Sequence, residues 1–519
     1  MKRRLSAVII SVVLLSSGWL GGTGLTLLGA FVPLLWLSDS YGATRRDWWR
    51  VFGWAALTFV LWNAATIWWI WGATPVGPFA ATLASTTLNM IAFMLYRTVS
   101  QRAPRALGYT LLTAGWIATE YWYTVGEFSW PWLILGNGFS HDVWAVQWYE
   151  YTGVFGGSLW VLVANIAIYE AWRTRSLRSA ATAAAAVLVP AAVSLAIYFT
   201  WHEPDAGTAR VTVVQPNVPV YEDFDPDWRI ENLLALAAEA PADTDYIIMP
   251  ETAVEDGMAI DEGDIEGDPT VARFAEFMRE RYPSATLITG AKSLRFYRPE
   301  NRTATARAGR GYYYDIFNSA VGVDSAGLQK IYHKGRLVIG VEKMPLPWLF
   351  EWLRFLVIDL GGTVGQLGVS SERETFRSGG TEAGAAICYE GLYGDFYGGF
   401  IRRGAQAMLI ISNDGWWGDT PGYRHLFTIS RLRAIEHRRA IARSANTGRS
   451  GFISARGDVG ETLGWDERGT IASTLALDTR QTFYTRYGDY LGRIAEYVML
   501  LCVLYYTAYR VKRRNYLVK

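Results

Sequence analysis

The sequence predicts an α-helical membrane domain of eight spans joined to an α/β domain that lies outside the cytoplasm. Three observations lead to this prediction. Residues 1–200 are almost continuously apolar, residues 201–487 hold most of the acidic residues, and residues 488–510 are apolar again. A bilayer core of roughly 30 Å requires about 20 residues of helix, so both apolar regions are long enough to cross it. We therefore expect a membrane domain at 1–200, a soluble domain at 201–487, and a last span with a basic tail at 488–519.

Seven candidate spans precede the soluble domain and one follows it. The first apolar run is interpreted as a retained span rather than a cleaved signal peptide, because six more runs follow it and no small-residue cleavage site closes it. The candidate spans are residues 5–20, 24–40, 51–72, 77–97, 106–124, 155–172, 180–200 and 488–510.

Basic residues indicate how these spans are oriented, since short cytoplasmic loops carry an excess of Lys and Arg. Basic residues precede the first span and follow the second, fourth, sixth and eighth, whereas the loops near 21–23 and 73–76 have none. This alternation predicts that both termini are cytoplasmic and that residues 201–487 are outside the cytoplasm, in the periplasm if the cell has one. A single miscounted span would reverse the side on which the soluble domain lies.

The soluble region alternates short β-rich runs with helical patterns, which is typical of an α/β fold. The β-rich runs are Val211–Val214, Tyr246–Met249, Thr286–Ile288, Ala385–Ile387, Met408–Ile411 and Gly451–Ser454. Helical patterns separate several of them, at Trp228–Ala240, Val271–Tyr282 and Tyr423–Arg439. Such folds place reactive groups after the carboxyl ends of strands, so the residues that follow these runs are candidates for a site.

Cys388 is the first such candidate. The chain has two cysteines, Cys388 and Cys502, which cannot form a disulfide framework or a multi-cysteine metal site. Cys388 follows a β-rich run and precedes the polar residues Tyr389 and Glu390. A thiol attacks only as the thiolate, which requires a base or a positive neighbour. From the residues alone, Cys388 is either a nucleophile or a small buried apolar side chain.

Two charged residues could supply what such a thiol needs. Glu251 follows another β-rich run, in IIMPETAVED, where it could accept the thiol proton or simply begin a helix. Lys334 lies in IYHKGRLVIGVE, where it could stabilise a thiolate and an oxyanion or be an ordinary solvated lysine. Glu342 follows eight residues later, and Asn413 and Asp414 come after a third run.

Together, the segments PET, YHK, CYE and SND resemble, in that order, the nitrilase superfamily. The resemblance covers about residues 210–480 and implies an αββα sandwich with a Glu-Lys-Cys triad. The membrane frame, VVQPNVP near 213–219, FSWPWLILG at 128–136 and the spacing of Glu342 and Pro345 also resemble the apolipoprotein N-acyltransferases. The resemblance thus implies a nitrilase-like catalytic domain held by membrane spans.

This resemblance implies a role for each candidate. Glu251 resembles the general base, Lys334 the lysine that stabilises the oxyanion, and Cys388 the nucleophile. Three supporting positions also match, namely Glu342, Tyr389 and Glu390. No metal and no organic cofactor are implied.

Aromatic residues in loops are candidates for lipid contact or for gating the substrate, and they are Phe224, Trp228, Trp352, Phe355 and Trp416. The segment Trp348–Ile358 reads WLFEWLRFLVI, which is too short to span and fits either a buried helix or a membrane-facing arm. Two positions depart from the family pattern. Val341 stands where the family usually has Gly, and Phe224 or Trp228 is the nearest aromatic residue where the family often has Trp.

The resemblance implies a ping-pong reaction. Cys388 would take an acyl chain from a phospholipid as a thioester, and the N-terminal amine of diacylglyceryl-cysteine in an apolipoprotein would then receive it. Membrane lipid is an expected partner, whereas the net charge of +1 gives no indication of a nucleic-acid partner.

Two alternatives to this reaction stay open. A membrane-tethered nitrilase-type amidohydrolase would use the same triad, but it would not need seven spans before its catalytic domain. A catalytically inactive lipoprotein-binding or transport protein would not need the triad. A transporter would be expected to carry intramembrane charges, for which Glu120 is the main candidate.

Overall fold

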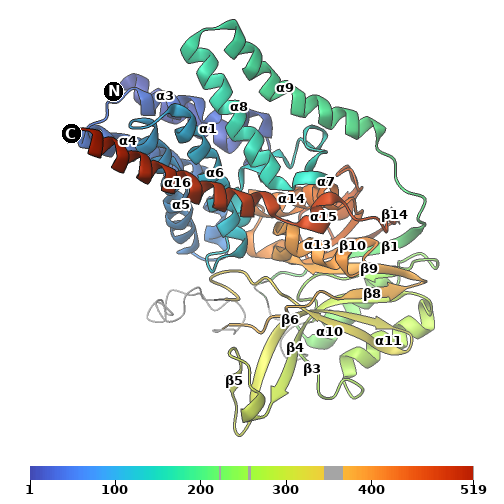
Figure 1. Cartoon of the computed structure of the whole chain (residues 1–519). Helices are drawn as coiled ribbons and strands as arrows, with labels where there is room; N and C mark the ends of the chain where they lie inside the picture. Colours follow the sequence, from blue (N-terminus) through green and yellow to red (C-terminus); the bar gives the residue numbers. More distant parts are fainter. Residues whose placement is uncertain (221, 223, 255–258, 344–365, 518–519) are drawn as a thin grey trace. The chain divides into compact units, whose positions relative to one another are not determined.

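The computed structural model describes residues 1–220, 222, 224–254, 259–343 and 366–517 (Figure 1). Contacts within the chain divide it into two compact units. The helical unit comprises Met1–Trp71, Pro75–Trp201 and Tyr487–Lys519, and the α/β unit comprises Gly72–Thr74 and His202–Arg486.

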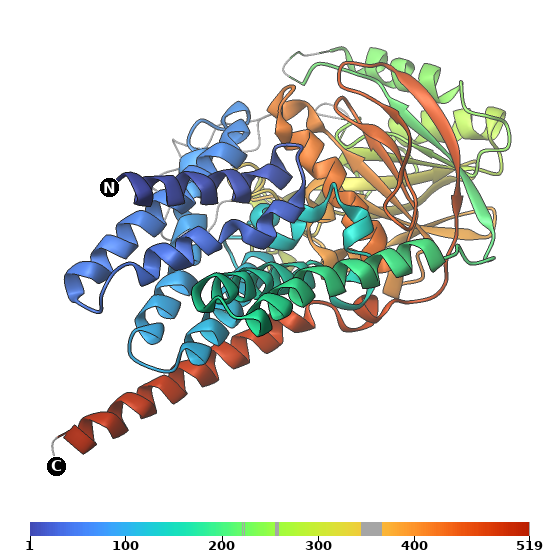
Figure 2. The same cartoon turned by 90° about the horizontal axis from the view of Figure 1, so that it is seen from above.

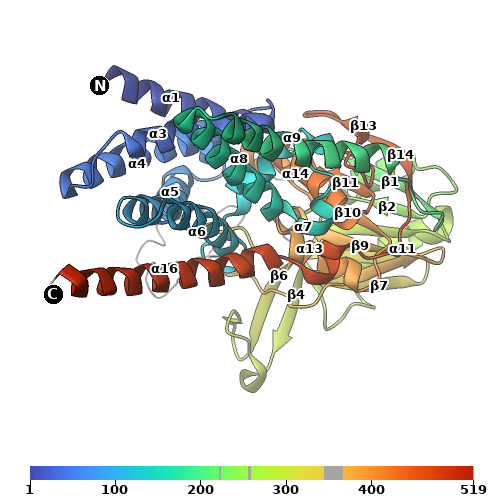
Figure 3. The same ribbon diagram turned by 45° about the horizontal axis from the view of Figure 1, so that its top comes forward.

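Helices form at each of the eight positions at which the apolar runs predict a span. The main helices are α1 (Lys2–Ser16), α2 (Leu27–Ala30), α3 (Val32–Asp39), α4 (Arg45–Ile67), α5 (Gly77–Ser100), α6 (Arg105–Val125), α8 (Val154–Thr174), α9 (Leu177–Thr200) and α16 (Tyr490–Leu517). Within this unit α8 packs against α9, and α16 runs along α6 (Figure 3).

Five helical segments among the described residues are long and apolar enough to cross a membrane. They are Arg45–Gly72, Gly77–Ser100, Val154–Thr174, Leu177–Thr200 and Tyr490–Arg513. The first predicted span corresponds to α1, which has 15 residues, and the second to the shorter apolar stretch Gly24–Asp39. The number of eight spans therefore stays a prediction.

The second predicted span is broken near Phe31 for a local reason. Pro33 lies in the first turn of α3, where its missing N–H prevents a continuous helix through α2. Asn165 of α8 satisfies the backbone groups at this break, because its Oδ1 accepts from Phe31 N at 2.7 Å and its Nδ2 donates to Leu27 O at 2.7 Å.

Two β-sheets form the centre of the α/β unit. In the described part of the chain, the first sheet has eight strands in the order β14-β1-β2-β4-β6-β5, with β3 beside β4 and β7 beside β6. Its strands are β1 (Thr208–Gln215), β2 (Tyr246–Ile248), β3 (Ile260–Asp261), β4 (Thr286–Tyr297), β5 (Arg307–Ala308), β6 (Tyr313–Asp324), β7 (Gly327–His333) and β14 (Gly469–Ala476). Figure 2 shows β14 (red) returning beside β1 (green), to which it pairs antiparallel.

The second sheet has six strands in the order β13-β12-β11-β10-β9-β8. These are β8 (Thr375–Ser378), β9 (Thr381–Ile387), β10 (Ala407–Ser412), β11 (Ile441–Ala445), β12 (Ser450–Ile453) and β13 (Val459–Leu463). All six predicted β-rich runs coincide with strands, so that part of the prediction is confirmed.

Helices cover the outer face of each sheet, which gives four layers (Figure 1). On one side α10 (Pro226–Ala237) and α11 (Pro269–Arg281) bury apolar residues against the eight-stranded sheet, including Leu233 and Phe274. On the other side lie α13 (Gly394–Arg402) and α14 (Pro421–His437). The C-terminal part of the chain thus has the four-layered αββα arrangement that the sequence predicts.

The helices of the α/β unit begin at residues that the sequence shows clearly. Asp225 caps α10, Asp268 caps α11 and Thr420 caps α14, each by accepting backbone N–H groups of the first turn. A proline follows each of these caps, and proline suits the first helical position because that N–H has no partner inside the helix.

Strand direction brings several strand ends to one edge. β1, β2 and β4 are mutually parallel, and β7 runs in the same direction because it is antiparallel to β6, which is antiparallel to β4. In the other sheet β9, β10 and β11 are parallel. The residues that follow β2, β7, β9 and β10 are those that the sequence singles out.

Gly290 of β4 provides a test of how tightly this edge is packed. A Cβ at this position would lie 2.5 Å from Glu251 Cα and 2.6 Å from Pro250 O, which is too close for backbone atoms to tolerate. We expect Gly290→Ala to lower the free energy of unfolding by about 1–3 kcal/mol, as other overpacked substitutions do. Thermal unfolding of the purified protein measures this change.

Gly460→Ala is the matched control, because a Cβ there would lie 3.6 Å from its nearest neighbours, Phe452 Cβ and O. Equal unfolding temperatures for the two variants would contradict the prediction.

Candidate active site

Three buried residues meet just beyond the carboxyl ends of strands. Glu251 follows β2, Lys334 follows β7 directly, and Cys388 follows β9 directly. Their exposed fractions are 4%, 1% and 6%, respectively. Lys334 Nζ donates to Glu251 Oε1 at 2.8 Å. The structure therefore brings together the residues that the sequence predicts as a triad.

Lys334 is the centre of a buried charge cluster. Its Nζ also lies 2.9 Å from Glu342 Oε1, so one ammonium group joins two carboxylates. Burial alone would lower the pKa of Lys334, but the charges of Glu251 and Glu342 hold that pKa well above its usual value. Lys334 is therefore a fixed positive charge at neutral pH.

The carboxylate of Glu251 is oriented by donors from three segments. Its Oε1 accepts from Lys334 and from Asn318 Nδ2 at 2.8 Å, and its Oε2 accepts from Asn413 N at 3.1 Å. The side chain of Asn413 donates to Thr252 Oγ1 at 2.9 Å, which ties the loop after β10 to the loop after β2.

Asn318 is a site residue that sequence reasoning missed. Its Nδ2 lies 2.8 Å from both Glu251 Oε1 and Glu342 Oε1, and its backbone O accepts from Lys334 N at 2.8 Å. Asn318 sits inside β6, where polar residues interrupt the apolar pattern, so the sequence predicts no strand there. The pairing of this segment with β7 identifies it as a strand, and that pairing can be seen only in the fold.

Cys388 begins a sharp turn at the end of β9. Its φ of +50° lies in the left-handed region, which is strained for any residue other than glycine. Burial and the negative charge of Glu251 raise the pKa of the Cys388 thiol above its usual value, while Lys334 acts in the opposite direction. Cys388 is therefore a protonated thiol at neutral pH.

Glu390 joins the loop of Lys334 to the loop of Cys388. Its Oε1 accepts from Tyr332 OH and from Gly335 N, both at 2.6 Å, and its Oε2 accepts from Ile387 N at 2.8 Å. Burial raises the pKa of Glu390 to about 7. The neighbouring Tyr389 is also buried, with 3% of its surface exposed.

Glu342 closes the short loop that follows Lys334. Its Oε2 accepts from Val338 N at 2.8 Å, and its own N donates to Val338 O at 2.9 Å. The left-handed backbone in this loop falls on Gly340, with φ of +83°, and not on Val341. The loop thus accommodates valine in place of glycine at 341 without a strained φ.

The other predicted residues are aromatic. Phe224 and Trp228 stack with ring centroids 4.7 Å apart, and Trp228 is 43% exposed. Trp416 belongs to the short 3-10 helix Asp414–Trp417, which follows the site residue Asn413. Trp352 and Phe355 lie outside the described residues.

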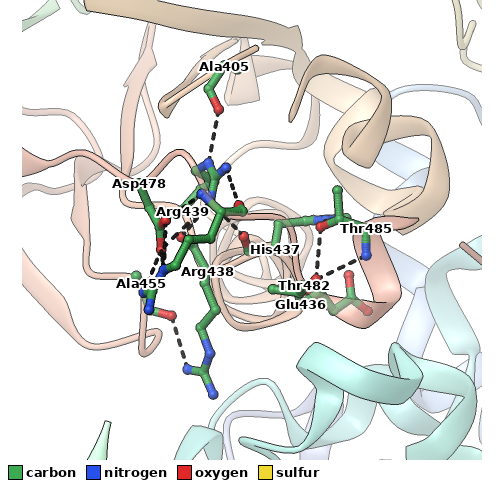
Figure 4. A network of polar contacts seen from close by, with 10 residues as sticks. Ala405, Glu436, His437, Arg438, Arg439, Ala455, Asp478, Thr482 and Thr485 are labelled. Atoms are coloured by element: carbon green, nitrogen blue, oxygen red, sulfur yellow. Dashed lines mark hydrogen bonds and ion pairs between the residues drawn. The ribbon is translucent and has the colours of Figure 1, made fainter. Parts of the chain in front are cut away.

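A second polar network in the α/β unit is separate from these residues (Figure 4). The ring of His437 hydrogen-bonds Thr485 Oγ1 at 2.9 Å and Gly394 O at 3.0 Å, and Arg439 Nε donates to Ala405 O at 2.9 Å. Burial and the charge of Arg433 lower the pKa of His437 well below its usual value. This network connects the end of α14 to backbone carbonyls at the start of α13 and in the turn after α13, and its role is structural.

Family models match most of the chain. The carbon-nitrogen hydrolase model matches residues 210–484, and the model of the apolipoprotein N-acyltransferase N-terminal domain matches residues 12–167. The first match contains all the site residues described above. The described residues contain no group of three His, Cys, Asp or Glu that could hold a metal ion.

Proteins named apolipoprotein N-acyltransferase are similar to this chain over most of their length. The Chlorobaculum tepidum protein is 28% identical over 90% of this chain and 88% of its own. The Allorhizobium ampelinum protein is 28% identical over 90% of both chains. The Bordetella bronchiseptica protein is 30% identical over 75% of this chain and 72% of its own.

Glu390 predicts a pH dependence of stability. Its pKa is about 7 in the folded protein and near the ordinary 4.5 in an unfolded chain, so stability falls as pH rises between these values. From pH 5 to pH 8 the free energy of unfolding of the native protein should fall by roughly 2–3 kcal/mol. That of Glu390→Gln should not show this fall. Thermal unfolding of both proteins at the two pH values measures the difference.

Glu461→Gln is the control, because Glu461 is an exposed carboxylate on β13. The prediction fails if Glu390→Gln and Glu461→Gln respond to pH in the same way.

Proposed function

Because this chain belongs to the apolipoprotein N-acyltransferase family, we infer that it transfers an acyl chain from a membrane phospholipid to the N-terminal amine of diacylglyceryl-cysteine in a lipoprotein. Family membership makes it an acyltransferase of lipoprotein biosynthesis with a carbon-nitrogen hydrolase domain. The observation that carries the proposed chemistry is the buried cluster in which Lys334 contacts Glu251 and Glu342, next to Cys388.

In the first half-reaction Cys388 is the nucleophile and Glu251 the general base. Glu251 takes the thiol proton, and the thiolate attacks the carbonyl carbon of a phospholipid ester, so that a C–S bond forms. Lys334 stabilises the oxyanion of the tetrahedral intermediate. The ester C–O bond then breaks, and the lysophospholipid alkoxide leaves with the proton that Glu251 returns.

In the second half-reaction the free amine of the lipoprotein attacks the thioester carbonyl. Glu251 accepts a proton from the attacking amine, and Lys334 again faces the oxyanion. The C–S bond breaks, an amide forms, and the Cys388 thiolate recovers its proton. Each half-reaction thus uses the same base and the same oxyanion partner, and neither requires a cofactor.

Supporting roles follow from the contacts. Glu342 and Asn318 hold Lys334 and Glu251 in one arrangement, because Glu342 accepts from Lys334 and from Asn318, and Asn318 also donates to Glu251. Glu390 fixes the loop of Lys334 relative to that of Cys388, and Tyr389 packs beside the nucleophile. We propose Phe224, Trp228 and Trp416 as lipid-contacting residues, together with Trp352 and Phe355.

The location follows from the same family. Apolar helices and family membership indicate an inner-membrane protein. We propose eight spans, domain boundaries at 1–200, 201–487 and 488–519, a periplasmic catalytic domain and two cytoplasmic termini. A catalytic domain tethered by spans at both ends would meet phospholipid and lipoprotein in the plane of the membrane, where both substrates are anchored.

The thioester is the direct test of this function. Purified enzyme incubated with a phospholipid that carries a labelled acyl chain should retain the label, and hydroxylamine should release it. Cys388→Ala should hold no label, because it lacks the nucleophile, whereas Cys502→Ala should behave as the native enzyme, because Cys502 lies in α16.

Adding a diacylglyceryl-cysteine peptide should then discharge the label onto the peptide amine. Label retained by Cys388→Ala would exclude this nucleophile, and discharge to water alone would indicate an amidohydrolase.

Reporter fusions test the proposed orientation. A phosphatase that is active only outside the cytoplasm should be active when fused after residue 300. It should be inactive when fused at Lys519 or, as a control in an earlier basic loop, at Arg102. The physical reason is the excess of basic residues in the loops predicted to be cytoplasmic. Activity at Lys519 with none at 300 would reverse the orientation.

A further inference from the structure

Ser412, the last residue of β10, lies beside the nucleophile. β9 and β10 are parallel, and Ile387 pairs with Ile411, so the next residues, Cys388 and Ser412, are neighbours across the two strand ends. Ser412 is fully buried, and its side chain is close enough to Cys388 to lower the pKa of the thiol. The roles proposed above for the triad and for the supporting glutamates do not involve Ser412.

A buried ion pair fixes Ser412 from its other side. Its hydroxyl donates to Asp414 Oδ1 at 2.8 Å. Arg443 NH2 lies 2.7 Å from Asp414 Oδ1, Arg443 NH1 lies 2.9 Å from Oδ2, and neither side chain is exposed. Arg443 pairs with Ile410 across β10 and β11, so it emerges on the same face of the sheet as Ser412.

A hydroxyl has one proton and two lone pairs, so it cannot donate to Asp414 and to Cys388 at once. When Ser412 donates to Asp414, its free lone pair can accept the S–H of Cys388. When Cys388 is a thiolate it has no proton, so only a hydrogen-bond donor can stabilise it. Turning the hydroxyl proton from Asp414 to sulfur supplies that donor.

Asp414 tolerates this turn because it keeps other partners. The bidentate contact with Arg443 leaves each carboxylate oxygen with a charged donor after Ser412 turns away. A serine held only by an unpaired carboxylate would not be free to leave it, since a buried anion without donors is costly.

We propose that Ser412 is a further catalytic residue, whose hydroxyl accepts from the Cys388 thiol and donates to the thiolate, with Asp414 and Arg443 as its positioning pair. This inference rests on the proposed role of Cys388 as nucleophile. Ser412 transfers no proton: Glu251 takes the thiol proton, and the hydroxyl proton stays on Ser412. Once the thioester forms, the sulfur is uncharged and the hydroxyl returns to Asp414.

The charges around Cys388 explain why such a donor matters. Burial raises the pKa of the thiol, the charge of Glu251 after β2 raises it, and the charge of Asp414 after β10 raises it as well. The charge of Lys334 after β7 and the neighbouring Ser412 hydroxyl lower it. Lys334 already donates to two carboxylates. Once the Ser412 hydroxyl has turned away from Asp414, its proton is available to the Cys388 thiolate.

The test measures thiolate formation without relying on acyl transfer. Full-length enzyme with Cys502→Ala leaves Cys388 as the single thiol, and its rate of alkylation by iodoacetamide is followed against pH. Ser412→Ala should raise the apparent pKa of Cys388 by about one to two units, as expected for a lost hydrogen bond to a charged group. Formation of the labelled thioester should slow by about tenfold to a hundredfold.

Two variants separate chemistry from packing. Ser412→Thr keeps a hydroxyl and should retain a pH profile close to that of the native enzyme. Ser444→Ala removes a serine of equal burial from the neighbouring strand, whose hydroxyl donates to Val214 O at 2.7 Å in the other sheet. Ser444→Ala should leave the alkylation profile of Cys388 unchanged, whatever its effect on stability.

The outcomes are distinct. Equal alkylation profiles in Ser412→Ala and Ser444→Ala would overturn the inference, and Ser412→Gly is the second hydroxyl-free variant if Ser412→Ala does not fold. Absence of thioester from every protein, with a shifted alkylation profile in Ser412→Ala, would instead count against the acyltransferase chemistry while supporting the contact between Ser412 and Cys388.

Discussion

A lysine ammonium buried between two carboxylates is the interaction on which the catalytic unit depends. Removing a charge from water costs several kcal/mol unless partners replace the lost hydration. Lys334 meets Glu251 at 2.8 Å and Glu342 at 2.9 Å, and Asn318 binds the same two oxygens. Because these partners come from separate segments, the loops after β2 and β7 and the strand β6 must form together before the charge can be buried.

Cys388, the proposed nucleophile, is also buried and is subject to the same constraint. A thiol in an apolar, buried position stays protonated, so its environment must supply a base and several donors at the moment of reaction. Glu251, Lys334 and Ser412 approach Cys388 from three strand ends, and Glu390 fixes one of those ends against another. Groups that are already oriented stabilise a developing charge without the cost of reorganising solvent, which is why rigid strand ends are suited to this chemistry.

The sequence predicts strands of the α/β unit where an apolar run is uninterrupted, as at β1 and β10. It predicts helices where a helical pattern follows a recognisable cap, as at α14. It fails at β6, where Asp315, Asn318 and Ser319 break the apolar pattern although all three are buried in the fold. For the same reason it identifies Glu251 and Cys388, which follow recognisable runs, and Lys334 through the segment YHK, but not Asn318. The partner of a buried polar residue depends on which strands are neighbours, and no local pattern contains that information.

The groups that we propose as catalytic are divided between the two sheets of the sandwich. Glu251, Lys334 and Asn318 belong to the eight-stranded sheet or its loops, whereas Cys388 and Ser412 belong to the six-stranded sheet. Neither sheet holds both the proposed base and the proposed nucleophile, so the proposed chemistry requires both sheets. A chain whose two sheets have not packed together therefore lacks the proposed reactive pair, because the face-to-face packing that completes the fold also brings Glu251 and Cys388 together.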